Sequence, residues 1–332
     1  MQQKATPSFL RYLWPLYKRL LRFVPLPILV GPWHGEVGFE ALYWLPFLAH
    51  LRHETGIPRD RFIPIARGGT ALWYDTPTGV ELHAMRTSQD VRIENWLAHN
   101  RTGWMKQYQV SDFDRSIIKD AAKTLGLRWY WPLHPKWMYQ TLTPFWGGHK
   151  GIQWLSDRVR FAGIPAPQMN GVTLPENYVA VKFYFRSTFP PNMANRSFCE
   201  QTIRKIAATH PVIVVDSGVH ADDHIDYLPK DRTNVQILSQ IVPMTAENNL
   251  AIQSAVMAKA TGVVGTYGGM TQMASRMGVP TFCYYSEWHS VCIAHKHLSE
   301  TLALQMRVPF VVSNVNELPI QQAIQPQVVR SS

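Results

Sequence analysis

Residues 262–285, GVVGTYGGMTQMASRMGVPTFCYY, constrain the fold more than any other stretch of the chain. The apolar run 262–265 predicts a buried strand. A glycine-rich loop follows, and a further strand begins at Val279. Between them, apolar residues recur at the i, i+3, i+4, i+7 spacing of a helix: Met270, Met273, Ala274 and Met277. A strand, a helix and another strand in this order predict an α/β unit with parallel strands.

The loop between this strand and this helix is rich in glycine and hydroxyl residues. The first turn of a helix presents unpaired amides and the positive end of the helix dipole, so it favours an anion such as phosphate. The spacing fits neither G-x-x-x-x-G-K-[ST] nor G-x-G-x-x-G, which disfavours a P-loop ATPase and a standard dinucleotide site. The candidate substrate-binding residues of this loop are Thr266, Tyr267, Gly268, Gly269 and Thr271.

A second pattern of strand, loop and helix occurs in ILVGPWHGEVGFEALYW, near the N-terminus. Ligands usually bind at the edge of a sheet where strands run into helices. The loop carries three side chains suited to acid–base chemistry, His34, Glu36 and Glu40. The alternative is a tight connection in which the glycines only relieve backbone strain.

Cations follow two further predicted strands. After RFIPIA, the residues Arg67 and Gly68 begin an Arg-Gly-Gly loop that presents backbone donors beside a cation. In YVAVKFYFRS, two-residue alternation places Lys182 and Arg186 on one face of a strand. Burying two cations is costly unless an anion meets them, so these residues are candidate anion ligands. The alternative is an edge strand whose charges face solvent.

The composition of the chain bounds the class of protein. With 332 residues and 46% hydrophobic content, the chain is long enough for two globular domains. The excess of 33 Lys and Arg over 23 Asp and Glu favours anionic partners, which include phosphates, nucleic acid and acidic membrane surfaces. Three cysteines without a C-x-x-C pair favour reduced thiols and a cytoplasmic setting.

The first 26 residues hold five cations and no acidic residue. If a helix begins after Pro15, then Leu16, Leu20, Phe23 and Val24 share one face. Basic residues and prolines interrupt the apolar sequence, which argues against a membrane span or a cleaved signal peptide. The pattern predicts an amphipathic arm that lies on an anionic membrane surface. The alternative is a helix packed on the protein's own body.

Two α/β halves follow this arm. The boundaries predicted from composition and turn residues are 1–26 for the arm, 27–165 for the first domain, 176–316 for the second domain and 317–332 for a polar tail. A segment rich in Pro and Gly, 163–178, is the predicted linker. Residues from about 95 to 160 are expected to be helical.

Two segments resemble known glycosyltransferases. GTYGGMTQMASRMGVPTFCYYS resembles the C-terminal nucleotide-sugar-binding segment of GT-B glycosyltransferases. GPWHGEVGFEALYW, together with RGG and LHPKWMY, resembles a group of bacterial glycosyltransferase-like proteins found with surface-polysaccharide genes. The resemblance implies two Rossmann-like halves that face a cleft, with a nucleotide-sugar donor bound mainly by the second half and the acceptor by the first.

The resemblance also implies a transferase that acts on a saccharide or lipid-linked acceptor at the cytoplasmic face of a membrane, without a metal or a cofactor. Glu36 is the favoured base for the acceptor hydroxyl, ahead of Glu40 and His34, and Gly35 lets the backbone approach the sugar. Lys182 and Arg186 would stabilise the leaving diphosphate. The alternatives are a nucleotide-sugar enzyme of the epimerase type and a basic nucleic-acid-binding protein, although no nucleic-acid-reading motif is present.

Two acidic motifs contain side chains that could bind a metal ion. SDFD at 111–114 matches the Asp-x-Asp of metal-dependent transferases, but a helical pattern follows it and favours an N-cap. HADDH at 220–224 could bind a divalent ion and is expected to be a solvated loop. No metal site is therefore predicted.

Overall fold

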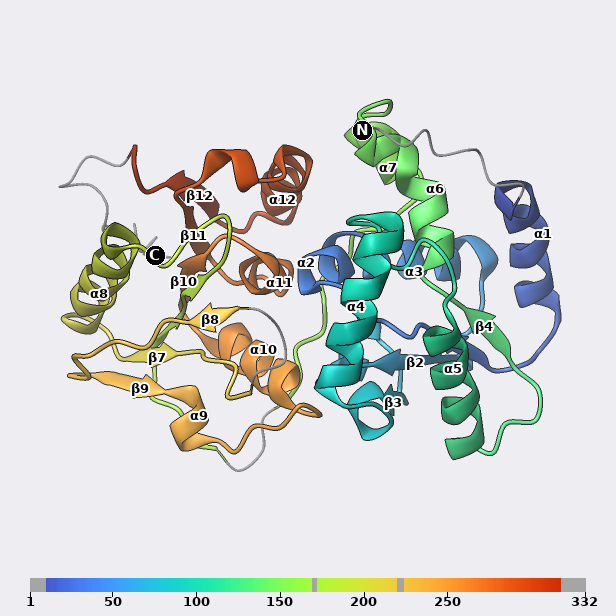
Figure 1. The fold of residues 1–332 in the computed structure, drawn as a ribbon, viewed down its shortest axis with the longest axis horizontal. Coiled ribbons are helices and arrows are strands. Elements are labelled where there is room, and N and C mark those ends of the chain that lie inside the picture. The colour runs from blue at the N-terminus through green and yellow to red at the C-terminus, as the bar shows by residue number, and fades with distance from the viewer. Residues whose placement is uncertain (1–9, 169–171, 220–223, 318–332) are drawn as a thin grey trace. The chain divides into compact units, whose positions relative to one another are not determined.

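The computed structural model describes residues 10–168, 172–219 and 224–317. The chain divides into two compact units, Met1–Pro165 and Ala166–Ser332 (Figure 1). Each unit has its own parallel sheet. The two units are described separately below.

The first unit contains a four-stranded parallel sheet. Its strands are β1 (Ile28–Val30), β2 (Phe62–Ala66), β3 (Val80–Glu81) and β4 (Trp131–Leu133). They lie in the order β3-β2-β1-β4, with Ile28 opposite both Phe62 and Trp131. The expectation of continuous helix from about 95 to 160 is wrong at β4. This strand is three residues long and contains a proline, so local patterning carries little sign of it.

Helices surround this sheet. They are α1 (Leu10–Phe23), α2 (Val37–Phe39), α3 (Leu45–Thr55), α4 (Ser88–Thr102), α5 (Asp112–Thr124), α6 (Lys136–Trp146) and α7 (Ile152–Ser156). A π-helical turn, η1 (Glu40–Trp44), joins α2 to α3, and three 3-10 turns lie at η2 (Arg59–Arg61), η3 (Thr70–Tyr74) and η4 (Leu82–Ala84). One apolar core cluster packs Leu29 and Ile65 of the sheet with Ile117 and Ala121 of α5.

The second unit contains a six-stranded parallel sheet. Its strands are β5 (Val179–Lys182), β7 (Val212–Val214), β9 (Val235–Ile237), β10 (Gly262–Thr266), β11 (Thr281–Tyr285) and β12 (Phe310–Asn314). They lie in the order β12-β11-β10-β5-β7-β9. Numbered by their place in the chain, this is the order 3-2-1-4-5-6 of a doubly wound Rossmann sheet.

A short antiparallel pair and several helices complete the second unit. The pair is β6 (Tyr184–Phe185) with β8 (Ile225–Asp226), and the helices are α8 (Met193–Ala207), α9 (Leu238–Ile241), α10 (Asn249–Lys259), α11 (Gly269–Arg276), η5 (Trp288–Ser290) and α12 (Ile293–Met306). Val181, Phe183 and Phe185 belong to the core, as the predicted alternation requires. The alternative of an exposed edge strand is wrong, because β5 is central in the sheet and Lys182 is buried.

The predicted class, an α/β protein with two Rossmann-like halves, is confirmed by these sheets. In such a sheet, ligands bind outside the carboxyl ends of the strands where the strand order reverses. In the first unit this switch point lies between β1 and β4, and in the second unit it lies between β5 and β10. The cleft between the halves stays a prediction.

Candidate functional site

The switch point of the second unit carries the glycine-rich loop predicted to bind an anion. Lys182 is the last residue of β5 and Thr266 the last residue of the neighbouring strand β10. The loop 266–268 leads directly into α11, which is eight residues long and begins at Gly269. The first amides of α11 therefore lie at the edge of the sheet where a Rossmann ligand is expected.

A tight backbone contact fixes this loop. A Cβ atom on Gly268 would clash with the hydroxyl oxygen of Tyr184, so a larger residue would require the tyrosine side chain to move. The same position lies 3.9 Å from Nη1 of Arg186, which brings the guanidinium beside the start of α11. Arg186 and Phe189 exchange backbone hydrogen bonds of 3.1 and 3.0 Å, so the residue projects from a closed turn.

The charge of Arg186 has no carboxylate partner within the described ranges of the chain. Its buried Nε also lacks a hydrogen-bond acceptor there. The side chain is partly exposed, so a ligand in solution can reach it. Among the described residues, Arg186 is therefore a cation beside α11 whose charge no carboxylate balances.

Lys182 lies at the same edge, but its charge is already balanced. Its Nζ donates to Asp226 Oδ1 at 2.9 Å, and both side chains are largely buried. Asp226 also accepts from the Ser217 amide and hydroxyl, each at 2.6 Å. Burial would raise the pKa of Asp226, but Lys182 and Ser217 hold it below its usual value. Lys182 thus contributes to the field of the site as half of an ion pair.

The hydroxyl groups of the loop bind the protein itself. Thr266 Oγ1 accepts from the Tyr184 amide at 3.0 Å and donates to the Tyr184 carbonyl at 2.8 Å. Thr271 Oγ1 accepts from the Gly268 amide at 3.1 Å. The hydroxyl of Tyr267 is buried and accepts from Gln272 Nε2 at 3.2 Å. These three side chains shape the loop, which leaves Gly269 and the helix amides to meet a ligand.

The switch point of the first unit is filled by a buried charge cluster. His34 follows β1, His134 follows β4, and Asp114 lies in the first turn of α5. His34 Nε2 lies 2.9 Å from Asp114 Oδ1, and His134 Nε2 lies 3.2 Å from Asp114 Oδ2. Burial would raise the pKa of Asp114, but the two histidines hold it well below its usual value. Its carboxylate is therefore ionised at neutral pH.

Hydrogen bonds orient both imidazoles. The Lys136 amide donates to His134 Nδ1 at 3.0 Å, so the other ring nitrogen, Nε2, is the one that faces Asp114. Asn95 donates from Nδ2 to the His34 carbonyl, which directs its Oδ1 to His34 Nδ1 at 2.9 Å. Both ring nitrogens of His34 thus face acceptors. Although the sequence makes His34 a candidate base, its ring is buried and fully engaged in this cluster.

The SDFD segment forms a helix cap, as predicted. The side chain of Ser111 accepts from the Asp114 amide at 3.1 Å, and Asp114 Oδ2 accepts from the Ser111 amide at 2.9 Å. Asp112 points to solvent and pairs with Arg115. The two aspartates do not converge on a common site.

The segment that follows β1, residues 31–40, is called the front loop below. Its two glutamates differ in accessibility. Glu36 is the N-cap residue of α2, and its side chain is 54% exposed and 3.5 Å from Lys106 Nζ. Glu40 opens the π-helical turn and is fully buried. Of the two carboxylates, Glu36 can contact a substrate without a rearrangement. π-helical turns such as Glu40–Trp44 occur often at functional sites.

Glu40 holds the front loop through Arg67. Tyr74 donates its hydroxyl to Glu40 Oε1 at 2.6 Å, and Arg67 Nη2 lies 4.0 Å from Glu40 Oε2. The same Arg67 nitrogen donates to the carbonyl of Gly35, the residue before Glu36. Glu40 and Arg67 are therefore positioned to fix the backbone that carries Glu36.

The backbone amides of the Arg-Gly-Gly loop donate hydrogen bonds to a carboxylate of the protein itself, that of Glu81. The amides of Gly68 and Gly69 donate to Glu81 at 3.0 and 2.8 Å. Both glycines have positive φ angles, 65° and 79°, which L side chains rarely adopt. The backbone donors predicted for a substrate at Gly68 are thus occupied by Glu81.

Glu40 should make the stability of the protein depend on pH. Burial raises its pKa to about 7 from an ordinary 4.5, against the opposing effects of Arg67 and Tyr74. The folded state then holds this proton more tightly than the unfolded state, so the free energy of unfolding falls as the pH rises through this interval. We expect a loss of about 2.5 kcal/mol that is absent in Glu40→Gln, measured by urea unfolding at pH 5 and pH 8.

Glu247→Gln, at an exposed carboxylate, is the control for this experiment and should keep the wild-type pH dependence. An identical fall in stability for wild type and Glu40→Gln would show that Glu40 is ionised across the range.

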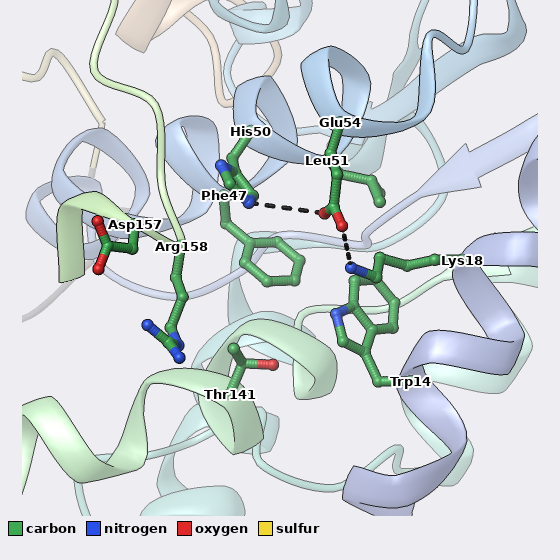
Figure 2. Close-up of a pocket in the computed structure, with 9 residues that line it drawn as sticks. All are labelled: Trp14, Lys18, Phe47, His50, Leu51, Glu54, Thr141, Asp157 and Arg158. Carbon is green, nitrogen blue, oxygen red and sulfur yellow. Dashed lines mark hydrogen bonds and ion pairs between the residues drawn. The ribbon is translucent and has the colours of Figure 1, made fainter. Parts of the chain in front are cut away.

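A pocket of about 380 Å³ lies elsewhere in the first unit (Figure 2). Trp14, Phe47 and Leu51 supply its apolar wall. On its polar side, Glu54 lies 2.6 Å from Lys18 Nζ and 3.6 Å from His50 Nε2. The pocket contacts the C-terminal half of α3, a helix that leads away from the carboxyl edge of the sheet toward the start of β2. It is therefore separate from the switch point.

Metal-ligating clusters and membrane-spanning helices are both absent from the described residues. Among them, no three His, Cys, Asp or Glu side chains form a group suited to a metal ion. None of the described helices combines the length and the apolar character that a membrane span requires. Most of the HADDH segment, residues 220–223, lies outside the described residues.

Comparisons with known proteins find glycosyltransferases. No protein-family model and no curated protein matches the sequence. Among solved structures, the E. coli heptosyltransferase WaaC with ADP is 13% identical with a TM-score of 0.45, covering 91% of this chain and 97% of that one. The glycosyltransferase SnogD from Streptomyces nogalater is 14% identical with a TM-score of 0.38, covering 89% and 88%.

A second structure of WaaC, with ADP-2-deoxy-2-fluoro heptose, is 12% identical with a TM-score of 0.40 and covers 81% of this chain and 91% of that chain. All three TM-scores lie below 0.5. The assignment of the fold therefore rests on the strand order of this chain.

The structure adds residues that the sequence patterns did not indicate. They are Tyr74, Glu81 and Asp226, which are partners of predicted residues, and His134, which pairs with Asp114. Asp114 belongs to the SDFD segment, but its pairing with His34 was not predicted. Asp226 lies 44 residues from Lys182, and Asp114 lies 80 residues from His34. The one available signal was the cation-rich strand at 181–186, which required an anion somewhere in the fold.

Proposed function

We propose that the protein is a glycosyltransferase that uses a nucleotide-sugar donor. The observation that carries the proposal is the site beside α11, where Arg186, which has no carboxylate partner among the described residues, lies at a helix N-terminus and a Rossmann switch point. A diphosphate is the ligand that matches two features at once, a guanidinium and a set of convergent amides. The absence of a side chain at Gly268 makes room for the Tyr184 hydroxyl, which holds the loop at the start of α11.

The acceptor, a saccharide or a lipid-linked saccharide, is assigned to the front loop of the first unit. Glu36 is the proposed base, because its carboxylate is accessible. In the reaction, the acceptor oxygen forms a bond to the anomeric carbon of the donor as its proton passes to Glu36, and the bond from that carbon to the diphosphate oxygen breaks. Arg186 and the amides of α11 stabilise the negative charge that develops on the diphosphate. Glu40 and Arg67 are positioning residues for Glu36.

Binding of a free nucleoside diphosphate tests the donor site. Arg186→Ala should weaken binding by about 1.5–3 kcal/mol, because the guanidinium makes a charge-assisted hydrogen bond to phosphate. Calorimetry with UDP, GDP and ADP measures the effect and identifies the preferred base. Arg204→Ala, which removes an exposed cation of α8, is the matched control and should leave affinity unchanged.

Two results would contradict the proposal. If none of the diphosphates binds to the wild-type protein, the site beside α11 is not a donor site. If binding is equally strong in wild type and Arg186→Ala, the ligand lies elsewhere. Release of nucleoside diphosphate that depends on added acceptor then distinguishes transfer from conversion of the donor alone.

A further inference from the structure

One face of α1 exposes a continuous row of apolar side chains. Leu13, Leu16, Leu20 and Phe23 are 36%, 56%, 39% and 65% exposed. Their spacing of three, four and three residues places them on the same side of the helix. Three of them belong to the face predicted from sequence, whereas Val24 follows the end of α1.

The opposite face of α1 is anchored to the first unit. The ring of Trp14 stacks on Trp137 at 5.0 Å and on Phe47 at 5.5 Å, and Leu21 is fully buried. Arg61 Nη2 donates to the carbonyls of Leu21 and Val24 at 3.0 and 2.6 Å. These contacts satisfy the buried face and the C-terminal end of the helix. The exposed row is therefore a surface that the described residues of its own unit do not cover.

Cations accompany the exposed row. Arg19 and Arg22 are exposed, and within the described part of the chain neither has a carboxylate partner. The Arg22 guanidinium lies 5.5 Å from the centre of the Phe23 ring. No acidic residue occurs in the sequence of α1, LRYLWPLYKRLLRF. A partner for this surface must therefore offer both apolar contact and negative charge.

We infer that this face of α1 docks on the surface of an anionic lipid bilayer. The apolar side chains enter the boundary between headgroups and acyl chains, while Arg19 and Arg22 contact lipid phosphates. A second copy of the chain fits less well, because it would bring the same cations together. The inference concerns the location of the protein and does not depend on the proposed reaction.

Vesicle flotation of the full chain tests this surface. Wild type should bind vesicles that contain phosphatidylglycerol. The triple variant Leu16→Gln, Leu20→Gln, Phe23→Gln should bind at least about tenfold more weakly, because it loses the free energy gained when apolar side chains enter the bilayer. Its fold should be unaffected, because these side chains are exposed and the substitutions remove little packing within the protein. The control, Met193→Gln, Ile293→Gln, Leu304→Gln, changes three even more exposed apolar residues of the second unit and should bind as wild type does.

The double variant Arg19→Gln, Arg22→Gln separates charge from apolar contact. Its binding to phosphatidylglycerol vesicles should fall by about 30-fold at low salt, and its binding to pure phosphatidylcholine should not change.

The inference is overturned if wild type does not bind the anionic vesicles, or if the triple variant binds them as wild type does. It is also overturned if light scattering shows that wild type is a dimer and that the triple variant is a monomer. Diphosphate binding, measured in the same variants, should be unchanged, so failure here is distinguishable from failure of the donor site.

Discussion

Asp114→Asn should destabilise the protein by about 3–5 kcal/mol, a large effect for a single substitution. The asparagine keeps the shape of the side chain but removes the charge that pairs with both His34 and His134. Two buried imidazoles would then lose the carboxylate that they face, where water cannot replace it. Urea unfolding at pH 7 measures the difference in the free energy of unfolding.

Asp112→Asn is a matched control in the same turn of α5. Its side chain is 99% exposed, so its effect should stay within about 0.5 kcal/mol. Comparable effects at the two positions would mean that the charge of Asp114 contributes only through the helix cap and not through the histidines.

Glu36→Gln should lower turnover by about 10²–10⁴-fold with little change in donor affinity. The amide preserves size and much of the hydrogen bonding but cannot accept the acceptor proton. Turnover is measured as acceptor-dependent release of the nucleoside diphosphate, and donor affinity is measured by calorimetry on the same samples.

Glu40→Gln distinguishes a base from a positioning residue. The amide can keep the contact with Tyr74, so turnover should fall less than about tenfold, and the pH dependence of stability should change instead. If Glu40→Gln abolishes turnover in a folded protein while Glu36→Gln remains active, the role of base belongs to Glu40. If both variants are active, the front loop does not supply a base.

Local patterns in the sequence predicted the elements of this fold well where the periodicity was clear. The helix expected at Met270 to Met277 is α11, Gly269–Arg276, and the strand expected in RFIPIA is β2. The cap at Ser111 was also predictable, because a capping box depends on residues three apart. Strand β4 was not, since its three residues include a proline and form no continuous buried apolar run of the kind seen in β1.

The partners of the candidate residues could not be predicted in the same way. Charge pairing inside a fold depends on which strands become neighbours, and this is a property of the whole sheet. The sequence showed that Lys182 needed an anion but not that Asp226 would supply it. The burial of Glu40 likewise depends on Tyr74 and Arg67, which reach it from the segment after β2.

The anchoring of α1 has a geometric consequence for an acceptor held in lipid. Because Trp14, Leu21 and Arg61 fix the helix to the first unit, a bilayer contacted by its outer face would meet a rigid body and not a tether. The height of the front loop above the headgroups would then be constant. Such a protein would select acceptors by reach, favouring those whose reactive hydroxyl projects from the membrane by one particular distance.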